Sequence, residues 1–320
     1  MTHSHLLASF SQISTTNMQM MKRSRRNHEK EHPEPEGGWT TTGNEADSDC
    51  SVLRLPEACL AHVISLTTPT DACRSSAVST AFQAAASSDP VWERFLPPDY
   101  RSIISRADHP VDLTTSKKEL FLSLAEDHIL VDQGTKSFWL DRTSGAKCYM
   151  LSSRSVHITW GDYPLYWRRI YLPDSRFEEV AELIAVCWLD IAGNIERTEL
   201  SPNTKYAAYL VFRLADESYG LDCPTQEARI ATGDQVATRR LSMYPCTTQA
   251  REGEQGGRAE DESTVSYPRE REDDWMEVEL GEFYNHQGDT GVVGFSLVEH
   301  VQLHWKKGLM LEGIEIRQKN

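Results

Sequence analysis

Residues 274–284 read DWMEVELGEFY, and this stretch decides the fold class of the 320-residue chain. Apolar and acidic side chains alternate along it, so Met276 and Val278 are expected to point into a core and Glu277 outward. A period of two is the pattern of a half-buried β-strand, because successive side chains of a strand lie on opposite faces of the sheet. The stretch therefore predicts a β-sheet with one covered face.

Other stretches of the C-terminal half carry strand patterns too. Two of them are separated by RTSGA and predict a hairpin with Gly145 in its turn. Strands that follow a run of helices argue for a separate antiparallel β-domain of the sandwich kind. The predicted strands lie in SFWLD (137–141), KCYMLSS (147–153), AELIAVCWLDIAGNI (181–195, broken at Gly193), TKYAAYLVFRL (204–214) and GIEIRQKN (313–320).

Residues 51–100 have a helical pattern instead. They predict three short helices, the first opened by Pro56 and the third by Pro90, because proline is preset for the first helical position. Apolar residues recur at helical spacing, such as Val63 in the first helix and Val78 in the second, and give each helix one apolar face. A unit of about fifty residues buries too small a share of its surface to be stable alone, so it is expected to lean on a partner.

One more helix is predicted over residues 115–131. Leu120 and Leu124 lie on one face, and Ser116 with Glu119 forms a capping box at its start. This helix would join the helical and the β-rich halves.

Two polar segments are expected to stay disordered. Residues 1–50 hold few branched apolar side chains and cannot bury enough surface to order themselves. Residues 247–274 hold nine acidic and four basic side chains and predict a solvated loop between two strands. The expected organisation is therefore a tail, a helical unit over 51–97, a helical linker over 98–136 and a β-sandwich over 137–320.

The composition excludes several kinds of partner. A net charge of −15 argues against nucleic acid, since binding phosphates along a duplex needs a basic surface. The seven cysteines form no C-x-x-C pair, which argues against structural zinc, and their odd number argues against a disulfide framework. No apolar run is long enough to span a membrane. We expect a cytoplasmic and nuclear protein with reduced thiols.

Motifs of enzyme chemistry are missing from the sequence. It has no G-x-S-x-G, no glycine-rich phosphate loop and no H-E-x-x-H. The three histidines between residues 286 and 304 lack the cysteine or acidic group that would complete a metal site. We therefore expect no catalytic residue, no metal and no cofactor.

Residues 53–95 resemble an F-box. The resemblance rests on LPEACLAHVIS (55–65), TPTDACR (68–74), AVSTAF (77–82) and VWERFL (91–96), in that order and spacing. It implies docking on the Skp-type adaptor of a cullin ubiquitin ligase through a partly apolar helical surface. The alternative is a linker subdomain that packs on the β-domain. The resemblance assigns adaptor binding to Leu55, Pro56, Ile64, Leu66, Val78 and Trp92.

The rest of the chain resembles the phloem protein 2 family, which includes the tobacco leaf agglutinin. The matching blocks run from FWLDRTSGAK (138–147) through IAGNI (191–195), KYAAYLVFRL (205–214) and DWMEVELGEFY to HWKKGLMLEGIEIR (304–317). The resemblance implies a lectin-like β-sandwich of the jelly-roll type, and some members bind N-acetylglucosamine oligomers or N-glycans. An F-box before this domain is the arrangement of the plant phloem protein 2 B type.

The resemblance assigns sugar binding to Trp160 and Trp167, within ITWGDYPLYWRR (158–169). Aromatic rings offer flat apolar faces for the C–H side of a sugar. Seven residues apart on one regular strand, the two rings would lie on opposite faces, so only a turn at GDYP (161–164) would bring them to one ligand. The alternative is that one or both rings pack in the core. The other strand tryptophans are expected in the core; they are Trp139, Trp188, Trp275 and Trp305.

These observations predict a protein without enzymatic activity. The first hypothesis is the substrate-recognition subunit of an SCF-type ubiquitin ligase, whose lectin-like domain binds a glycan or glycoprotein target. The second is a nucleocytoplasmic lectin of stress or defence, with a structural F-box-like segment. The third is a structural phloem or stress protein, in which residues 97–136 bury the helices against the sandwich.

Overall fold

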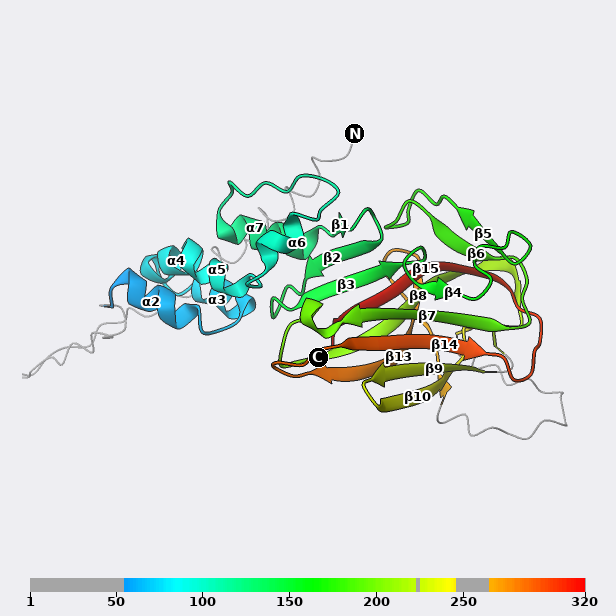
Figure 1. The fold of residues 1–320 in the computed structure, drawn as a ribbon. Coiled ribbons are helices and arrows are strands. Elements are labelled where there is room, and N and C mark those ends of the chain that lie inside the picture. Colours follow the sequence, from blue (N-terminus) through cyan, green and yellow to red (C-terminus); the bar gives the residue numbers. More distant parts are fainter. Residues whose placement is uncertain (1–54, 223–224, 246–264, 320) are drawn as a thin grey trace, which may run out of the picture. The chain divides into compact units, whose positions relative to one another are not determined.

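The computed structural model describes residues 55–222, 225–245 and 265–319 (Figure 1). The predicted disordered tail over 1–50, and residues 247–264 of the predicted loop, lie outside the described residues. Helices come first and an antiparallel β-sandwich follows, so the α+β fold class is confirmed.

Short helices fill the first part of the described chain. The predicted second helix is in fact two, because Thr68 and Ser79 each accept a hydrogen bond from a backbone N–H of their own helix, from Asp71 and Phe82 respectively. The break between them leaves Val78 in a turn. The helices are α2 (Glu57–Ile64), α3 (Pro69–Ser75), α4 (Thr80–Ser87), α5 (Asp89–Phe95), α6 (Tyr100–Ile104) and α7 (Lys117–Glu126).

Helix α7 begins where the sequence predicts and ends earlier. The capping box of Ser116 and Glu119 is present. The helix ends at Glu126 because Asp127 adopts an extended conformation, and Ile129–Val131 then forms strand β1. Branched apolar residues fit a strand that pairs with a neighbour better than a frayed helix end, and Ile129 pairs with Phe138.

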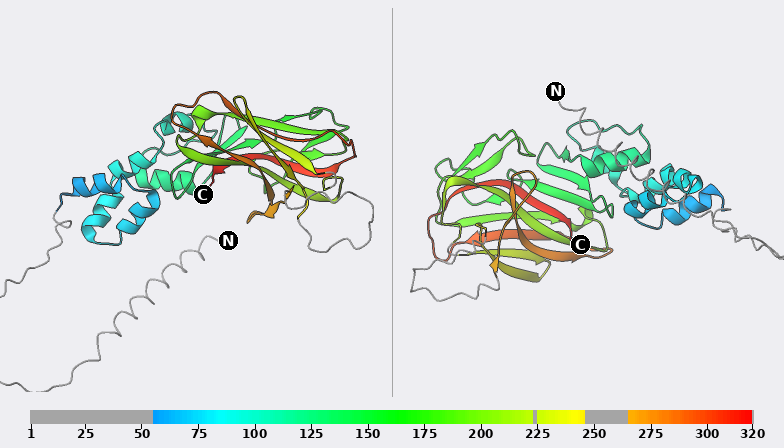
Figure 2. Two further views of the ribbon diagram at one scale, coloured as in Figure 1. Left: turned by 90° about the horizontal axis from the view of Figure 1, so that it is seen from below. Right: turned by 180° about the vertical axis from the view of Figure 1, so that it is seen from behind.

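Two stacked sheets form the β-domain (Figures 1 and 2). The larger sheet has the order β1-β2-β3-β15-β8-β13-β12, with β6 pairing β15 and β5 pairing β6; the smaller has the order β11-β10-β9-β14-β7-β4. The strands not yet bounded are β2 (Lys136–Leu140), β3 (Lys147–Ser152), β4 (His157–Ile158), β5 (Trp167–Ile170), β6 (Val180–Leu183), β7 (Leu189–Glu196), β8 (Thr204–Tyr219), β9 (Gln226–Thr232), β10 (Gln235–Leu241), β11 (Val265–Ser266), β12 (Arg269–Glu270), β13 (Met276–Asn285), β14 (Val292–Glu299) and β15 (Lys307–Gln318).

The β2–β3 hairpin confirms the predicted turn. Gly145 has a φ of +76°, a left-handed conformation that glycine adopts without strain. A Cβ there would lie 2.8 Å from the carbonyl oxygen of Phe95. The turn therefore needs glycine both for its backbone conformation and for its close approach to the end of α5.

Two expectations about strands were wrong. The apolar run over 181–195 breaks after Leu183 rather than at Gly193, which lies inside β7 where Val156, Leu151 and Ile314 leave no room for a side chain. The predicted loop over 247–274 ends early as well. Its last residues form β11, which pairs β10, and β12, which pairs β13, because the backbone groups of these neighbouring strands offer them hydrogen-bond partners.

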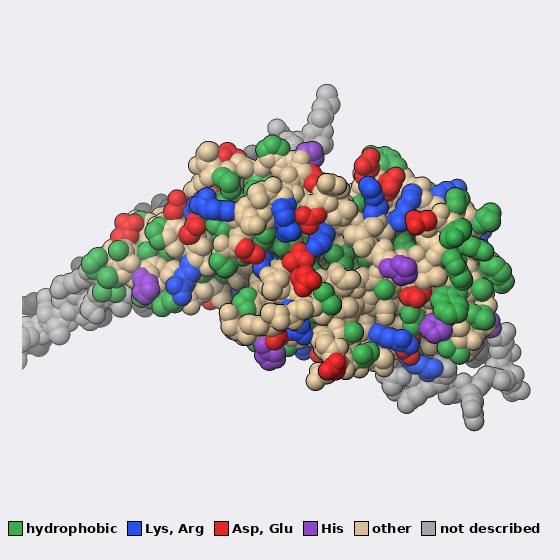
Figure 3. Space-filling view, viewed as in Figure 1, with side chains coloured by type: hydrophobic (Ala, Val, Ile, Leu, Met, Phe, Trp, Pro, Cys, Tyr) green, Lys and Arg blue, Asp and Glu red, His purple; other side chains and the backbone are tan. Residues whose placement is uncertain are grey.

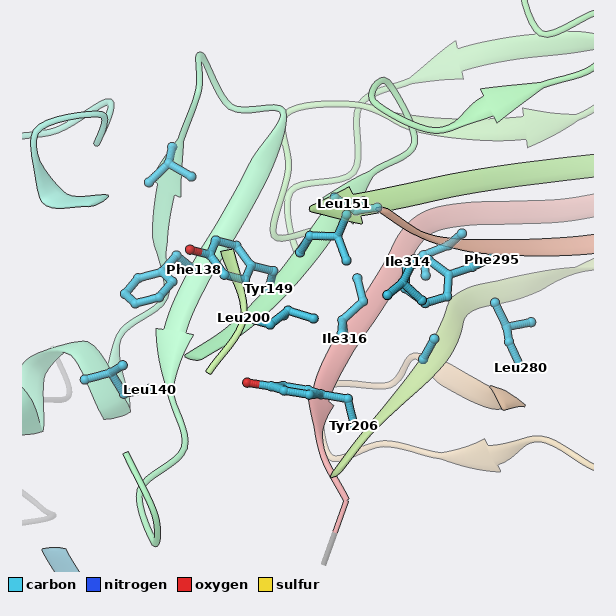
Figure 4. Packing of buried hydrophobic residues seen from close by; sticks show 14 of the residues in the cluster. Phe138, Leu140, Tyr149, Leu151, Leu200, Tyr206, Leu280, Phe295, Ile314 and Ile316 are labelled. Atoms are coloured by element: carbon cyan, nitrogen blue, oxygen red, sulfur yellow. The ribbon is translucent and has the colours of Figure 1, made fainter. Parts of the chain in front are cut away.

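The core lies between the two sheets. Leu151, Ile314 and Ile316 of the larger sheet lie in one cluster with Phe295 of the smaller sheet (Figure 4). Leu280 of β13 points into the same core, as the alternation of DWMEVELGEFY predicts.

The outer face of β13 is not simply solvated. Glu277 points away from the core, yet only 3% of it is exposed. Arginines from β12 and β15 cover it, and Arg269 and Arg317 both donate hydrogen bonds to its carboxylate. The predicted outward direction holds, and the expectation of a solvent-facing glutamate was wrong.

Candidate functional site

Exposed apolar side chains lie on the helical unit. Leu66 is 58% exposed and Val78 is 64% exposed, while Leu55 and Pro56, which precede α2, are exposed too. Val63 belongs with them, because α2 turns Leu60, Ala61 and Ile64 inward instead. We call Leu55, Pro56, Val63, Leu66 and Val78 the apolar rim.

Two residues assigned to the adaptor surface are buried. Ile64 and Trp92 are 3% and 1% exposed. The indole N–H of Trp92 donates a 2.7 Å hydrogen bond to the carbonyl of Ala86, and its ring meets Phe95 and Phe121. In this structure neither side chain is available to a partner. Both shape the helices that present the apolar rim.

A second group of exposed side chains is aromatic. Trp160 and Trp188 are 38% and 39% exposed, and their rings meet edge to face at 6.4 Å. Tyr166 lies 5.4 Å from Trp160, Tyr163 lies 6.4 Å from Tyr166, and His300 stacks on Trp188 at 4.8 Å. Figure 3 shows hydrophobic side chains gathered over the end of the sandwich that carries β5 and β6. We call these five residues the ring cluster.

The predicted turn between the two assigned tryptophans is present. The N–H of Gly161 donates to the carbonyl of Ile158 at 2.8 Å, and the N–H of Tyr163 donates to the carbonyl of Trp160 at 3.0 Å. Trp160 itself has a φ of 59°, a left-handed conformation that costs an ordinary residue about 1–2 kcal/mol. Backbone strain of this kind gathers at functional sites.

The turn does not bring both rings to one surface. Trp167 begins β5 and is only 3% exposed, so its faces are covered and it cannot stack on a ligand in this structure. The partner of Trp160 in the ring cluster is Trp188, which the sequence placed in the core. Trp305 is also exposed, whereas Trp139 and Trp275 are buried as expected.

The exposure of Trp188 and Trp305 has a structural cause. Both precede the start of a strand, in segments joined by the short bridge between Val186 and Lys306. A local signal for Trp188 existed, because it stands at the point where the apolar run breaks before β7. The break was not predicted there, because the sequence over 181–195 reads as one apolar run.

A buried ion pair supports these segments. Lys306 is fully buried, pairs with Glu299, and donates hydrogen bonds to the carbonyls of Cys187 (3.1 Å) and His304 (2.7 Å). Burial opposes ionisation of Glu299, but hydrogen bonds from Lys306 and from backbone N–H groups outweigh it, so the pKa of Glu299 is lowered. The ion pair fixes the loop beside Trp188. A ring that is already held in place loses less conformational entropy when it binds a ligand.

The apolar rim and the ring cluster lie in two regions that match known protein families. A family model described as phloem protein 2 matches residues 146–318, and one described as F-box domain matches residues 52–94. The chain belongs to the phloem protein 2 family.

Its relatives carry both regions. F-box protein PP2-B10 of Arabidopsis thaliana is 44% identical over 265 residues, which cover 82% of this chain and 92% of the relative. F-box protein At2g02240 of the same plant is 43% identical over 263 residues, covering 82% of this chain and 79% of the relative. F-box protein PP2-B15 is 41% identical, covering 83% and 97%. The chain is thus a plant protein with an F-box and a phloem protein 2 domain.

The two arginines that follow Trp167 differ in their exposure. Arg168 keeps a side chain that is 60% exposed and donates a 2.8 Å hydrogen bond to Glu182. Arg169 instead donates to the hydroxyl of Ser153 at 3.0 Å, and burial lowers its pKa. Of the two arginines, Arg168 is the more exposed and offers its donors at the surface.

Two further properties concern the described part of the chain. Its residues contain no group of three or more histidine, cysteine, aspartate or glutamate side chains placed to hold a metal ion. None of the described helices is long and apolar enough to cross a membrane.

Proposed function

We propose that this phloem protein 2 family member is the substrate-recognition subunit of an SCF-type cullin ubiquitin ligase. The apolar rim of the F-box would bind a Skp-type adaptor, and through it the cullin. The β-sandwich would present the target, and ubiquitin transfer would belong to the partner subunits. This role would place the protein in the cytoplasm and nucleus.

The observation that carries the proposal is the exposure of the apolar rim. A unit whose only task was to support the sandwich would turn Val63, Leu66 and Val78 inward, because exposed branched side chains gain nothing from water. The inward face of these helices is already filled by Ile64 and Trp92. Exposed apolar residues beside a complete core are typical of a docking surface.

Adaptor capture tests this proposal. The full chain carrying Leu66→Glu or Val78→Glu should lose retention of a Skp-type adaptor by at least about tenfold, because a charge buried in an apolar interface costs more than about 1.4 kcal/mol. The measurement is co-purification with quantified adaptor. Leu113→Glu, an exposed leucine of the linker, and Val236→Glu on β10 are the matched controls and should retain it. Wild-type protein that captures no adaptor while another F-box protein does would exclude the ligase role.

For the sandwich, we propose that the ring cluster binds glycans, with N-acetylglucosamine-containing chains as the first candidates. Trp160 and Trp188 offer exposed ring surface with their planes 68° apart, and the exposed Arg168 offers hydrogen-bond donors. Sugar recognition needs this combination of an aromatic face and polar groups that orient hydroxyls. Trp167, being buried, would support the fold rather than touch the glycan.

A glycan array with the intact protein tests the second part. Trp160→Ala and Trp188→Ala should each weaken glycan binding by about fivefold or more, since a lost stacking contact removes about 1 kcal/mol or more. Tyr284→Ala is the control, because Tyr284 is an exposed aromatic residue near the end of β13, outside the ring cluster, where Arg197 donates to its carbonyl. Folded wild-type protein that binds no glycan would leave a protein-binding sandwich, and glycan binding without adaptor capture would favour the nucleocytoplasmic lectin.

A further inference from the structure

The outer face of the larger sheet carries a charged cleft that neither proposed role uses. Tyr209 of β8 pairs with Glu279 of β13 on one side and with Glu315 of β15 on the other. Paired residues, and residues two apart on one strand, share a face of the sheet, so Glu277 and Arg317 lie on this face as well. A cavity of about 620 Å³ lies over it. Its charged lining residues are Arg239, Arg269, Arg317, Lys319, Glu277 and Glu279.

The lining is positive in a negative protein. Four cationic and two anionic side chains line the charged cleft, and Glu282 and Glu315 pair with Lys319 and Arg317 from outside the lining, whereas the whole chain carries a net charge of −15. A local excess of cations against the charge of the chain raises the concentration of anions at that point. Solubility does not explain it, because the net charge of the chain already serves that purpose.

Buried carboxylates hold these cations in place. Glu277 accepts hydrogen bonds from Arg269 (2.6 Å) and Arg317 (2.8 Å). Burial opposes its ionisation, but the hydrogen bonds from Arg317 and Arg269 and the charge of Arg271 outweigh it, so the pKa of Glu277 falls to about 2. Glu277 is therefore ionised at neutral pH and fixes two guanidinium groups.

The other side of the cleft is built in the same way. Glu279 accepts hydrogen bonds from Arg239 (2.7 Å) and Lys319 (2.9 Å). The guanidinium of Arg317 lies 3.8 Å from the centre of the Tyr209 ring. Donors that are already fixed lose little conformational entropy when a ligand binds, and a guanidinium matches the geometry of an oxyanion.

We propose that the charged cleft binds a phosphate group with two negative charges, free or carried on a phosphorylated peptide. A phosphate dianion offers several acceptor oxygens to the fixed guanidinium groups. The cavity is within the size range of small-molecule sites, so it leaves room for the organic group that carries the phosphate. A neutral sugar would not require four cations.

Titration calorimetry of the full chain at low ionic strength tests this proposal. Inorganic phosphate, a phosphoserine peptide and its unphosphorylated form are the three probes. We expect inorganic phosphate or the phosphopeptide to bind and the unphosphorylated peptide not to bind. Binding of the phosphopeptide, reversed by inorganic phosphate, would assign the peptide as the source; binding of inorganic phosphate alone would assign a free phosphate.

Two peripheral variants locate the binding. Arg239→Gln and Lys319→Met should each weaken binding by about tenfold or more, because a hydrogen bond to a charged group contributes about 1.5–3 kcal/mol. Arg229→Gln on β9, whose side chain is also partly exposed and paired, is the matched control and should bind normally. Circular dichroism checks that each variant is folded. No phosphate binding by folded wild-type protein, or equal losses in all three variants, would overturn the proposal.

Discussion

At the scale of single residues, Trp160 joins backbone strain to an exposed ring. Its φ of 59° is unfavourable for any residue with a Cβ, and its ring lies in the ring cluster beside Trp188 and Tyr166. A glycine would relieve the strain and remove the ring. The sequence therefore keeps a side chain at a position where the backbone alone would favour glycine.

Two variants of Trp160 separate the ring from the backbone. Trp160→Gly should have a higher free energy of unfolding than Trp160→Ala by about 1 kcal/mol, because glycine adopts the left-handed conformation without strain. Both variants should lose glycan binding to the same extent. Urea unfolding and a glycan titration measure the two effects. An alanine variant as stable as the glycine variant would mean that the turn relaxes and that Trp160 carries no strain.

At the scale of elements, β13 and β15 bury charges on a face that the sequence pattern marks as polar. Glu277 and Glu315 are 3% and 2% exposed, and both form ion pairs with Arg271 and Arg317. Removing one partner of a buried pair leaves an uncompensated charge, which costs about 3–5 kcal/mol. The sheet is therefore stabilised by its charges only while the carboxylates are ionised.

This arrangement predicts a pH dependence. The folded pKa of Glu277, about 2, lies below its ordinary value of 4.5, so its stabilising effect is complete above about pH 4.5 and is lost as the pH falls toward 2. Glu277→Gln should lower the free energy of unfolding at neutral pH, and its difference from wild type should shrink below about pH 4.5. Urea unfolding across this pH range measures it.

Glu270→Gln is the control for this prediction. Glu270 lies on β12, pairs with Met276 and is exposed, so its loss should leave the stability of the sheet nearly unchanged at every pH. A constant difference between wild type and Glu277→Gln across the pH range would show that the carboxylate is not stabilised by ionisation.

At the scale of the whole molecule, the apolar rim and the ring cluster lie in different parts of the chain. The apolar rim spans residues 55–78, and the ring cluster draws on 160–166, Trp188 and His300. The described residues from 55 onward belong to one contact unit, and this unit carries both surfaces. A receptor that joins a target to a ligase needs this combination.

A bridging experiment tests that combination. Immobilised glycan should retain a cullin only when both the adaptor and this protein are present, because no other component would contact both. Leu66→Glu should lose the adaptor and cullin while staying on the glycan, and Trp188→Ala should bind the adaptor in solution without reaching the glycan. Retained fractions read by quantitative immunoblot measure both. Retention of the cullin by Leu66→Glu would show that the apolar rim is not the docking surface.

The sequence alone predicted most elements and their order, although β1 falls in a predicted helix and β11 and β12 fall in a predicted loop. The capping box at Ser116, the turn at Gly145 and the alternation over 274–284 depend on near neighbours, and each is present in the structure. Only the tertiary structure decided which side chains face solvent. Trp167, which was assigned to a ligand, is buried, and Trp188, which was expected in the core, is exposed, because burial depends on which distant segments pack against a residue. Local patterns set backbone periodicity, whereas exposure, and with it the site, is set by contacts between residues far apart in the chain.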